Sequence, residues 1–188
     1  MGQVMADYRA ISAVCEAIIW LLQAKYRPEL FPDQSLEFIV ASAYDLSRYS
    51  KDKKTGVSLY LYQVLPEVAL RNAPHRSAAS EFQPPVLPLE LNFLLTAWAR
   101  DAGTQHAILG WMMRVLEDHP VLTAAMLNRA EPGPFQPHET VEISPLGLSN
   151  EALLSIWQSA APSAYQLSIP YAARGVSIGT YKSQHDAG

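Results

Sequence analysis

Five histidines are spread along the chain, and none of them forms a metal-binding pattern. They are His75, His106, His119, His138 and His185. No two lie four residues apart and no HExxH sequence occurs, so the usual helical zinc pair is absent. His119 follows Glu117 and Asp118 at the expected end of a helix, where a partly charged imidazole offsets the negative terminus. We therefore expect a structural role for His119 rather than a catalytic or metal-binding one.

Two other patterns are typical of catalysis. Glu117 and Asp118 are adjacent, so on a helix they point about 100° apart and are poorly placed to act on one substrate. The segment Gly175-Val176-Ser177-Ile178-Gly179 matches GxSxG, the nucleophile elbow, which requires a helix directly after the serine. Only nine residues follow Gly179. We expect Ser177 to lie in a C-terminal strand whose glycines allow a bend.

The single cysteine, Cys15, excludes an internal disulfide and a cysteine zinc cluster. It lies on an apolar helical stripe, so we expect a buried, unreactive side chain. Neither GxGxxG nor GxxxxGK[ST] occurs, so no glycine-rich phosphate loop is present. A 20.8 kDa chain without a ligand cluster, nucleophile or phosphate loop is expected not to be an enzyme and to need no cofactor or metal.

Positive charge is concentrated in one segment of an acidic chain. The segment Ser47–Gly56, expected to be a loop, has a local charge of +3 in a chain whose net charge is −4. The acidic balance argues against a nucleic-acid partner. The segment is either a solvated loop or a protein contact, and it flanks an expected strand whose other end leads into the proline-rich loop Asn72–Pro88. The candidate partner contacts are Arg48, Lys51, Lys53, Lys54, Arg71 and His75.

Length and composition favour a single globular domain. A chain of 188 residues is long enough for a core of its own. Charged residues make up 17%, below the roughly 25% of an average domain, while apolar residues make up 49%. A surface this short of charge suggests that another chain covers part of it. We expect one domain over residues 1–180 and a short C-terminal tail over residues 181–188.

The apolar run Ala13–Leu22 is interrupted by Glu16, is too short to span a bilayer and lacks a convincing cleavage site. We therefore expect no signal peptide, no membrane contact and synthesis in the cytoplasm.

Hydrophobic periodicity predicts three helices. In the first, apolar side chains recur at spacings of three or four until Pro28 and Pro32 end the pattern. This stripe consists of Val4, Tyr8, Ile11, Cys15, Ile18, Leu22 and Tyr26. Val14, Ile19 and Leu21 widen it, so more than one side of the helix should be covered. The second helix runs from Thr104 to about Asp118 and should bury Ile108, Trp111, Met112 and Val115. The third begins after Ser149 as N-cap and should bury Leu153, Leu154 and Trp157.

Alternating apolar residues predict four or five strands. They cover residues 36–41, 57–62, 89–96 and 165–172, with a short fifth candidate at 140–144. Pro170 cannot donate to a ladder, so the last strand should be an edge strand or bulged there. A third loop, which contains three prolines, is expected at Glu131–His138. The fold class is therefore α+β: a single domain with a mixed, mostly antiparallel sheet, on which an N-terminal helix and two further helices pack.

Four collinear segments resemble one known family. The segment 57–66, VSLYLYQVLP, running on to Arg71-Asn72, resembles its "LYLYQV.P…RN" strand. The segment 87–98, LPLELNFLLTAW, resembles its "PPLALNLHYLLTAY" segment. His106–Leu122 resembles its helix ending in "HPVL", and residues 141–169 resemble its closing "LW…YrLSv.Y" section. The family is the N-terminal domain of the cap, or tail-terminator, protein of contractile injection systems of the antifeeding-prophage type.

The resemblance implies a structural protein that forms a hexameric ring on the distal end of an inner tube and a contractile sheath and stops their growth. The implied partners are further copies of the chain, the tube protein and the sheath protein, within an assembled injection particle. The low charge and the lack of a catalytic set agree with a subunit of an assembly. The rival interpretations are a small monomeric adaptor and a hydrolase that uses Ser177 or a histidine.

Overall fold

The computed structural model describes residues 7–32, 34–52, 54–67, 86–129 and 133–179. Within these ranges the helices are α1 (Ala10–Lys25), α2 (Ala43–Asp52), α4 (Ala102–Asp118), α5 (Ala124–Leu127) and α6 (Asn150–Ala160), with a 3₁₀ turn at Pro28–Leu30. The strands are β1 (Glu37–Val40), β2 (Gly56–Pro66), β3 (Leu87–Trp98), β4 (Val121–Thr123), β5 (Thr140–Pro145) and β6 (Ser168–Ile178).

The six strands form one sheet in the order β1-β2-β3-β6-β5-β4. β1 pairs with β2 in parallel, and every other neighbouring pair is antiparallel. The predicted α+β class with a mixed, mostly antiparallel sheet is confirmed. The sheet has one strand more than the upper predicted number, because the three-residue β4 is too short to show an alternating pattern.

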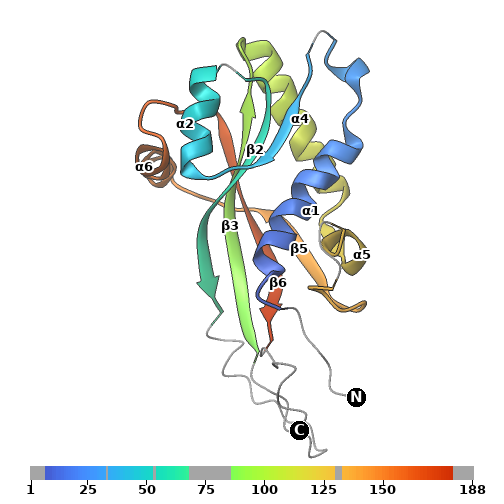
Figure 1. Ribbon diagram of the computed structural model, residues 1–188. Helices are drawn as coiled ribbons and strands as arrows, with labels where there is room; N and C mark the ends of the chain where they lie inside the picture. The colour runs from blue at the N-terminus through green and yellow to red at the C-terminus, as the bar shows by residue number, and fades with distance from the viewer. Residues whose placement is uncertain (1–6, 33, 53, 68–85, 130–132, 180–188) are drawn as a thin grey trace, which may run out of the picture.

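Helices cover both faces of this sheet (Figure 1). α1, α4 and α5 pack on one face, where the larger hydrophobic core lies. Nine of the 16 residues of α1 are buried, including Val14, Ile19 and Leu21, so the prediction that more than one side of this helix is covered is confirmed. Trp111 of α4 is half-buried in an aromatic cluster with Tyr26, Phe31 and Phe38, whose ring centroids lie 5.6–6.3 Å apart.

A smaller core lies on the opposite face, under α2 and α6. Trp98 is its centre, with the rings of Tyr49 and Trp157 edge-on at 5.4 and 6.1 Å between centroids. The indole nitrogen of Trp98 donates to Ser58 Oγ at 2.8 Å, so this buried polar group is paired. Leu154 was predicted to be buried with Trp157 but is 47% exposed, because α6 turns only one narrow stripe toward the sheet.

The prediction of a loop over Ser47–Gly56 is wrong, because residues 47–52 belong to α2. The helix begins with a reciprocal cap: Ser42 Oγ accepts from the amide of Asp45 at 3.3 Å, and Asp45 accepts from the amide of Ser42 at 2.9 Å. Leu46 and Tyr49 then bury one face. Arg48 and Lys51 therefore lie on a helix, and Lys54 lies in the short connection that follows it.

β6 is longer than predicted and ends at Ile178. β6 is an interior strand of the sheet. Its pairing with β5 covers Tyr171–Arg174 and does not include Pro170, which lies just before this stretch. The prediction of an edge strand therefore holds only at Pro170. The register with β3 shifts between Leu89 and Leu91, opposite Gly175, whose φ of +84° suits a bulge glycine. The predicted bend at the C-terminal glycines is thus located at Gly175.

Candidate functional site

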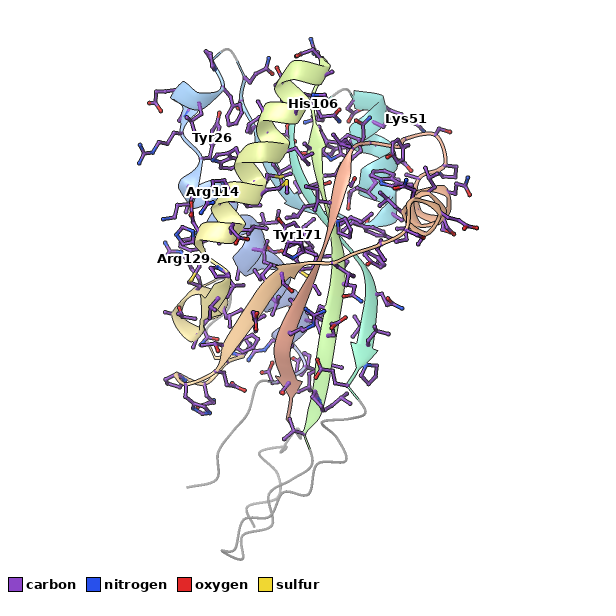
Figure 2. The ribbon with its side chains drawn as sticks, turned by 180° about the vertical axis from the view of Figure 1, so that it is seen from behind. Tyr26, Lys51, His106, Arg114, Arg129 and Tyr171 are labelled. Carbon is purple, nitrogen blue, oxygen red and sulfur yellow. The ribbon has the colours of Figure 1, made fainter. Side chains whose placement is uncertain are left out.

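The basic segment is partly neutralised by ion pairs within the chain. Arg48 Nε lies 3.4 Å from Asp52 Oδ2, one helical turn away, and Lys54 Nζ lies 2.5 Å from Glu37 Oε1 on β1. Lys51 is exposed and has no ion pair among the described residues. Figure 2 shows it on α2, far from Arg114 and Arg129. Of the predicted positive patch, the described residues are therefore Lys51, which has no ion pair among them, and two paired cations, Arg48 and Lys54.

Glu37 links β1 to α2. Its second carboxylate oxygen accepts from the Tyr49 hydroxyl at 2.8 Å. The hydrogen bond from Lys54, followed by that from Tyr49, lowers the pKa of Glu37 below its ordinary value of 4.5. Burial, followed by the Glu37 carboxylate, raises the pKa of Tyr49. These contacts give Lys54 a structural role, so it is a weaker candidate for a partner contact than Lys51.

Three candidate partner contacts, Lys53, Arg71 and His75, lie outside the described residues. The structure fixes where their segments are attached. α2 leads into Gly56 at the start of β2, and the chain leaves the other end of that strand at Pro66 and Glu67. The two candidate contact segments are thus attached at opposite ends of an 11-residue strand. That they contact a partner remains a prediction.

The catalytic candidates are not gathered into a site. His119 caps the C-terminus of α4, with Nδ1 2.9 Å from Val115 O. Asp118 forms an ion pair with Arg114, whose Nε lies 3.0 Å from its carboxylate. Ser177 lies inside β6, opposite Pro88 of β3, so the strand continues where a nucleophile elbow would turn into a helix. The structural interpretation of His119 and Ser177 is the one that this geometry supports.

Over the part of the chain that the structure describes, no cluster of three or more His, Cys, Asp or Glu side chains has the arrangement of a metal site. Across the same residues, no helix is long and apolar enough to cross a membrane.

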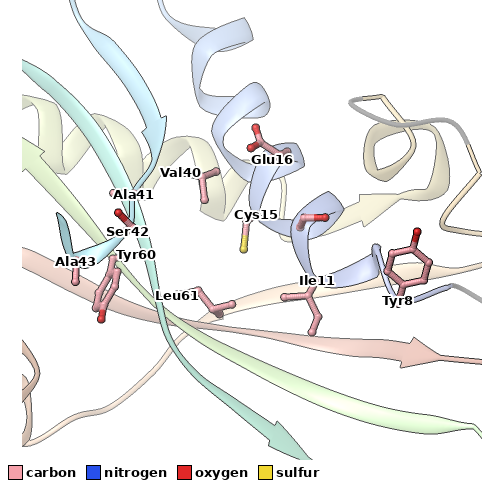
Figure 3. Close-up of a pocket in the computed structure, with 11 residues that line it drawn as sticks. Tyr8, Ile11, Cys15, Glu16, Val40, Ala41, Ser42, Ala43, Tyr60 and Leu61 are labelled. Carbon is pink, nitrogen blue, oxygen red and sulfur yellow. The ribbon is translucent and has the colours of Figure 1, made fainter. Parts of the chain in front are cut away.

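An open, mostly apolar groove of about 520 Å³ lies between α1 and the outer edge of the sheet (Figure 3). Its lining comes from α1, from the turn that joins β1 to α2 and from β2. Cys15 lies at its base and is 3% exposed, as the sequence predicted. Burial, followed by the nearby Glu16 carboxylate, raises the pKa of this thiol to about 12, so the thiolate needed for reactivity does not form near neutral pH.

The sheet continues beyond the region that α2 and α6 cover (Figure 1). On that uncovered face, Arg174 Nε donates to Glu90 Oε2 at 2.6 Å, and its Nη1 donates to Ser144 Oγ at 2.7 Å. Val64, Leu65 and Leu87, at the same end of the sheet, are 38–39% exposed. Sequence reasoning missed both this open end and the groove. The Ser42-x-x-Asp45 cap could have located the start of α2, and hence the end of β1, but not which strand lies beside β2.

A family model described as the Pvc16 N-terminal domain matches residues 13–187. The chain belongs to this family. No curated protein in the comparison matches. The resemblance seen in the four sequence segments is confirmed.

Two solved structures have the same fold as this member of the Pvc16 N-terminal domain family. One is the sheath/tube terminator of PVC, an extracellular contractile injection system, in its extended state: TM-score 0.57, 19% identity, 98% of this chain and 60% of that chain covered. The other is the tube-terminating cap of the anti-feeding prophage: TM-score 0.57, 16% identity, 92% of this chain and 56% of that chain covered. The chain thus spans about three fifths of the length of these two proteins.

Proposed function

We propose that this protein is a structural cap, or tail terminator, of a phage-tail-like contractile injection system. The observation that carries the proposal is the shared fold: 98% of the chain aligns with a sheath/tube terminator. Its membership of the Pvc16 N-terminal domain family supports the same conclusion. The cap binds the distal end of the inner tube and the sheath as a ring of identical copies, six by analogy with the family, and stops further polymerisation.

The proposed mechanism is one of surface matching. A tube built from stacked identical subunits offers the same heterologous surface at each new level, so it grows until something binds that surface without recreating it. A terminator needs one end that matches the tube and another end that does not. The two ends of this sheet differ in their covering, because one lies between helices and the other extends beyond them, and this difference supports the proposal.

The proposal does not require an enzyme. The groups typical of catalysis have structural partners here: His119 caps a helix, Asp118 pairs with Arg114, and Ser177 lies within a strand. The tube protein, the sheath protein and further copies of the chain are the proposed partners. The proposed location is the assembled particle.

Deletion of the gene, followed by electron microscopy of the particles, tests the proposal. We expect tubes or sheaths of uncontrolled length, or particles that fall apart, and rescue by the parent chain. Ser177→Ala and His119→Ala should rescue equally well, since neither side chain is proposed to act chemically. Uniform contractile particles without the protein would contradict the cap function. Failure of a folded, incorporated Ser177→Ala chain to rescue would favour the hydrolase.

A further inference from the structure

The outer edge of β2 has no neighbouring strand over its second half. β1 pairs with β2 from Glu37 opposite Gly56 to Val40 opposite Leu59, and the chain then turns away into α2. Within the described ranges, no strand lies beside β2 from Leu61 to Pro66. An open edge of this kind exposes unpaired backbone groups and is a template for another strand.

The register identifies which backbone groups face this open edge. Ala41 donates to the carbonyl of Leu59, so the backbone groups of Leu59 face outward, toward β1. Tyr62 is an extra residue between Leu61 and Gln63. This bulge shifts by one residue the alternation of backbone groups that face β3 and groups that face the open edge. Beyond it, the amide of Glu67 donates to Pro88 on β3. The N–H and C=O of Val64 therefore point away from β3, into the open space.

The opposite edge of the sheet ends in β4, which pairs with β5 alone. The amide of Ile143 on β5 donates to the carbonyl of Pro120, so the backbone groups of Pro120 and Leu122 face inward. Those of Val121 and Thr123 face outward, and the side chain of Val121 is 45% exposed.

The two open edges lie at the same level of the sheet and run in the same direction. Successive register partners across the sheet connect Val64 to Leu91, then to Ala173, then to Ile143. The amide of Ile143 donates to Pro120, the residue just before β4. Four successive antiparallel pairings separate β2 from β4, so the two strands point the same way. Copies placed side by side in one orientation bring the β4 edge of one copy against the β2 edge of the next.

We propose that the second half of β2 pairs in parallel with β4 of a neighbouring copy of this chain. Val64 then lies opposite Leu122 of the neighbouring copy: its N–H donates to the carbonyl of Val121, and its C=O accepts from the amide of Thr123. The contact is heterologous, so repeated copies close into a ring when the rotation between them closes. The groove between α1 and β2 lies on the same face of the sheet as α5. In the proposed arrangement, the exposed surface of α5 from the neighbouring copy packs into this groove.

This inference rests on the proposed ring, and cross-linking within assembled particles tests it. Leu65 and Thr123 lie opposite each other in the proposed register, both exposed and both directed to the α2/α6 face. After oxidation, the Leu65→Cys/Thr123→Cys chain should form a ladder on a non-reducing gel in steps of 20.8 kDa. Each single variant should stay at one subunit mass, because Cys15 is buried. If the double variant is incorporated and yields no ladder, the pairing is wrong.

Proline substitutions separate backbone pairing from side-chain contact. Thr123 has φ −81° and ψ 160°, which proline adopts without strain, so Thr123→Pro removes only an outward N–H. Val64→Pro removes the outward N–H on the other edge. We expect both variants to keep the melting transition of the parent but to lose ring formation. Thr123→Ala and Val64→Ala, which keep the N–H, should keep the ring. Rings formed by both proline variants would overturn the proposal.

The outcomes distinguish this inference from the proposed function. If Val64→Pro abolishes capping while Thr123→Pro caps normally, the β2 edge binds a strand of another protein and a second copy is the wrong occupant. If the parent caps particles as a ring that both proline variants also form, the cap function stands and the edge pairing fails. If particles are uniform without the protein, the cap function itself fails.

Discussion

The two ends of the sheet differ in what covers them. Toward Trp98, strands lie between α1 and α4 on one face and α2 and α6 on the other, and every residue of β3 from Leu91 to Trp98 is buried. Toward Leu87, α2 and α6 no longer cover the sheet, and β2 changes from buried at Gly56–Leu59 to exposed at Gln63–Pro66. The comparison teaches that one end of the sheet holds the fold together while the other leaves backbone edges and side chains exposed, and these are the surfaces that the proposed ring contact would use.

The largest expected effect comes from a cavity in the covered end. Phe93 is fully buried and stacks on Tyr171, with 6.0 Å between ring centroids. Phe93→Ala should lower the free energy of unfolding by about 3–5 kcal/mol, because it removes apolar burial and leaves a void. Leu65→Ala at the open end should cost less than about 1 kcal/mol. Urea denaturation measures both, and equal losses would contradict the comparison.

A backbone contact at the start of β2 gives the next largest effect. A Cβ at Gly56 would lie 2.1 Å from the carbonyl oxygen of Glu37, inside the parallel pair that joins β1 to β2. Gly56→Ala should therefore cost about 2–4 kcal/mol, within the range of mutations that strain a packed backbone. Gly110→Ala is the matched control, because its Cβ meets nothing within 4 Å in α4, and it should stabilise by about 1 kcal/mol. An unchanged free energy of unfolding for Gly56→Ala would contradict this, because it would mean that β1 shifts away from the added Cβ without cost.

The cap of α2 contributes less. Ser42→Ala removes the hydroxyl that accepts from the amide of Asp45 and should cost about 1 kcal/mol. Ser47→Ala, in the same helix but away from the cap, should be neutral or slightly stabilising, because alanine is the better helix former. Thermal unfolding of the pair measures the difference, and equal effects would mean that packing alone holds α2 in place.

A still smaller, pH-dependent effect is expected at Glu37, where Lys54 and Tyr49 lower the carboxyl pKa. The folded protein binds fewer protons there than the unfolded chain, so the stabilisation is complete above pH 4.5 and is lost as pH falls through the lower, folded pKa. Both side chains of the ion pair are more than 40% exposed, which limits the effect. The free energies of unfolding of Glu37→Gln and the parent should differ at pH 7 and converge as the pH falls through the folded pKa of Glu37. A constant difference would contradict this.

The basic segment should matter for docking and hardly at all for stability. Lys51→Glu changes an exposed charge with no ion pair among the described residues, so unfolding should shift by less than about 0.5 kcal/mol. Incorporation into particles should weaken, and the defect should depend on salt because exposed charges are screened. Arg48→Glu is a poorer test because it also breaks the pair with Asp52. Unchanged incorporation at low and high salt would remove the segment from the interface.

Much of the fold follows from local patterns in the sequence. The α1 stripe from Ile11 to Leu22, the Ser149 cap of α6 and the alternation of β2 and β3 are each visible within a dozen residues, and the structure contains them. Of the rest of the predicted stripe, Val4 lies outside the described residues, and Tyr8 lies before α1 and is 68% exposed. The Ser149 hydroxyl accepts from the amide of Ala152 at 3.1 Å, as its position predicts.

The failures have physical causes. α2 carries many charges and buries only Leu46 and Tyr49, so its apolar stripe is too sparse to stand out. The open edge of β2 is not a local property: it exists because β1 stops at Val40 and because β4 lies four strands away along the sheet. The residues of β2 alone therefore do not predict that half of one edge of this strand lacks a neighbouring strand.

Imaging of where the protein lies in intact particles tests the cap function most directly. The chain, carrying a small gold-binding tag at a site that leaves assembly intact, should label one end of each particle and only that end, with a single cluster of gold. Label distributed along the shaft, or absent from purified particles of normal length, would contradict the account.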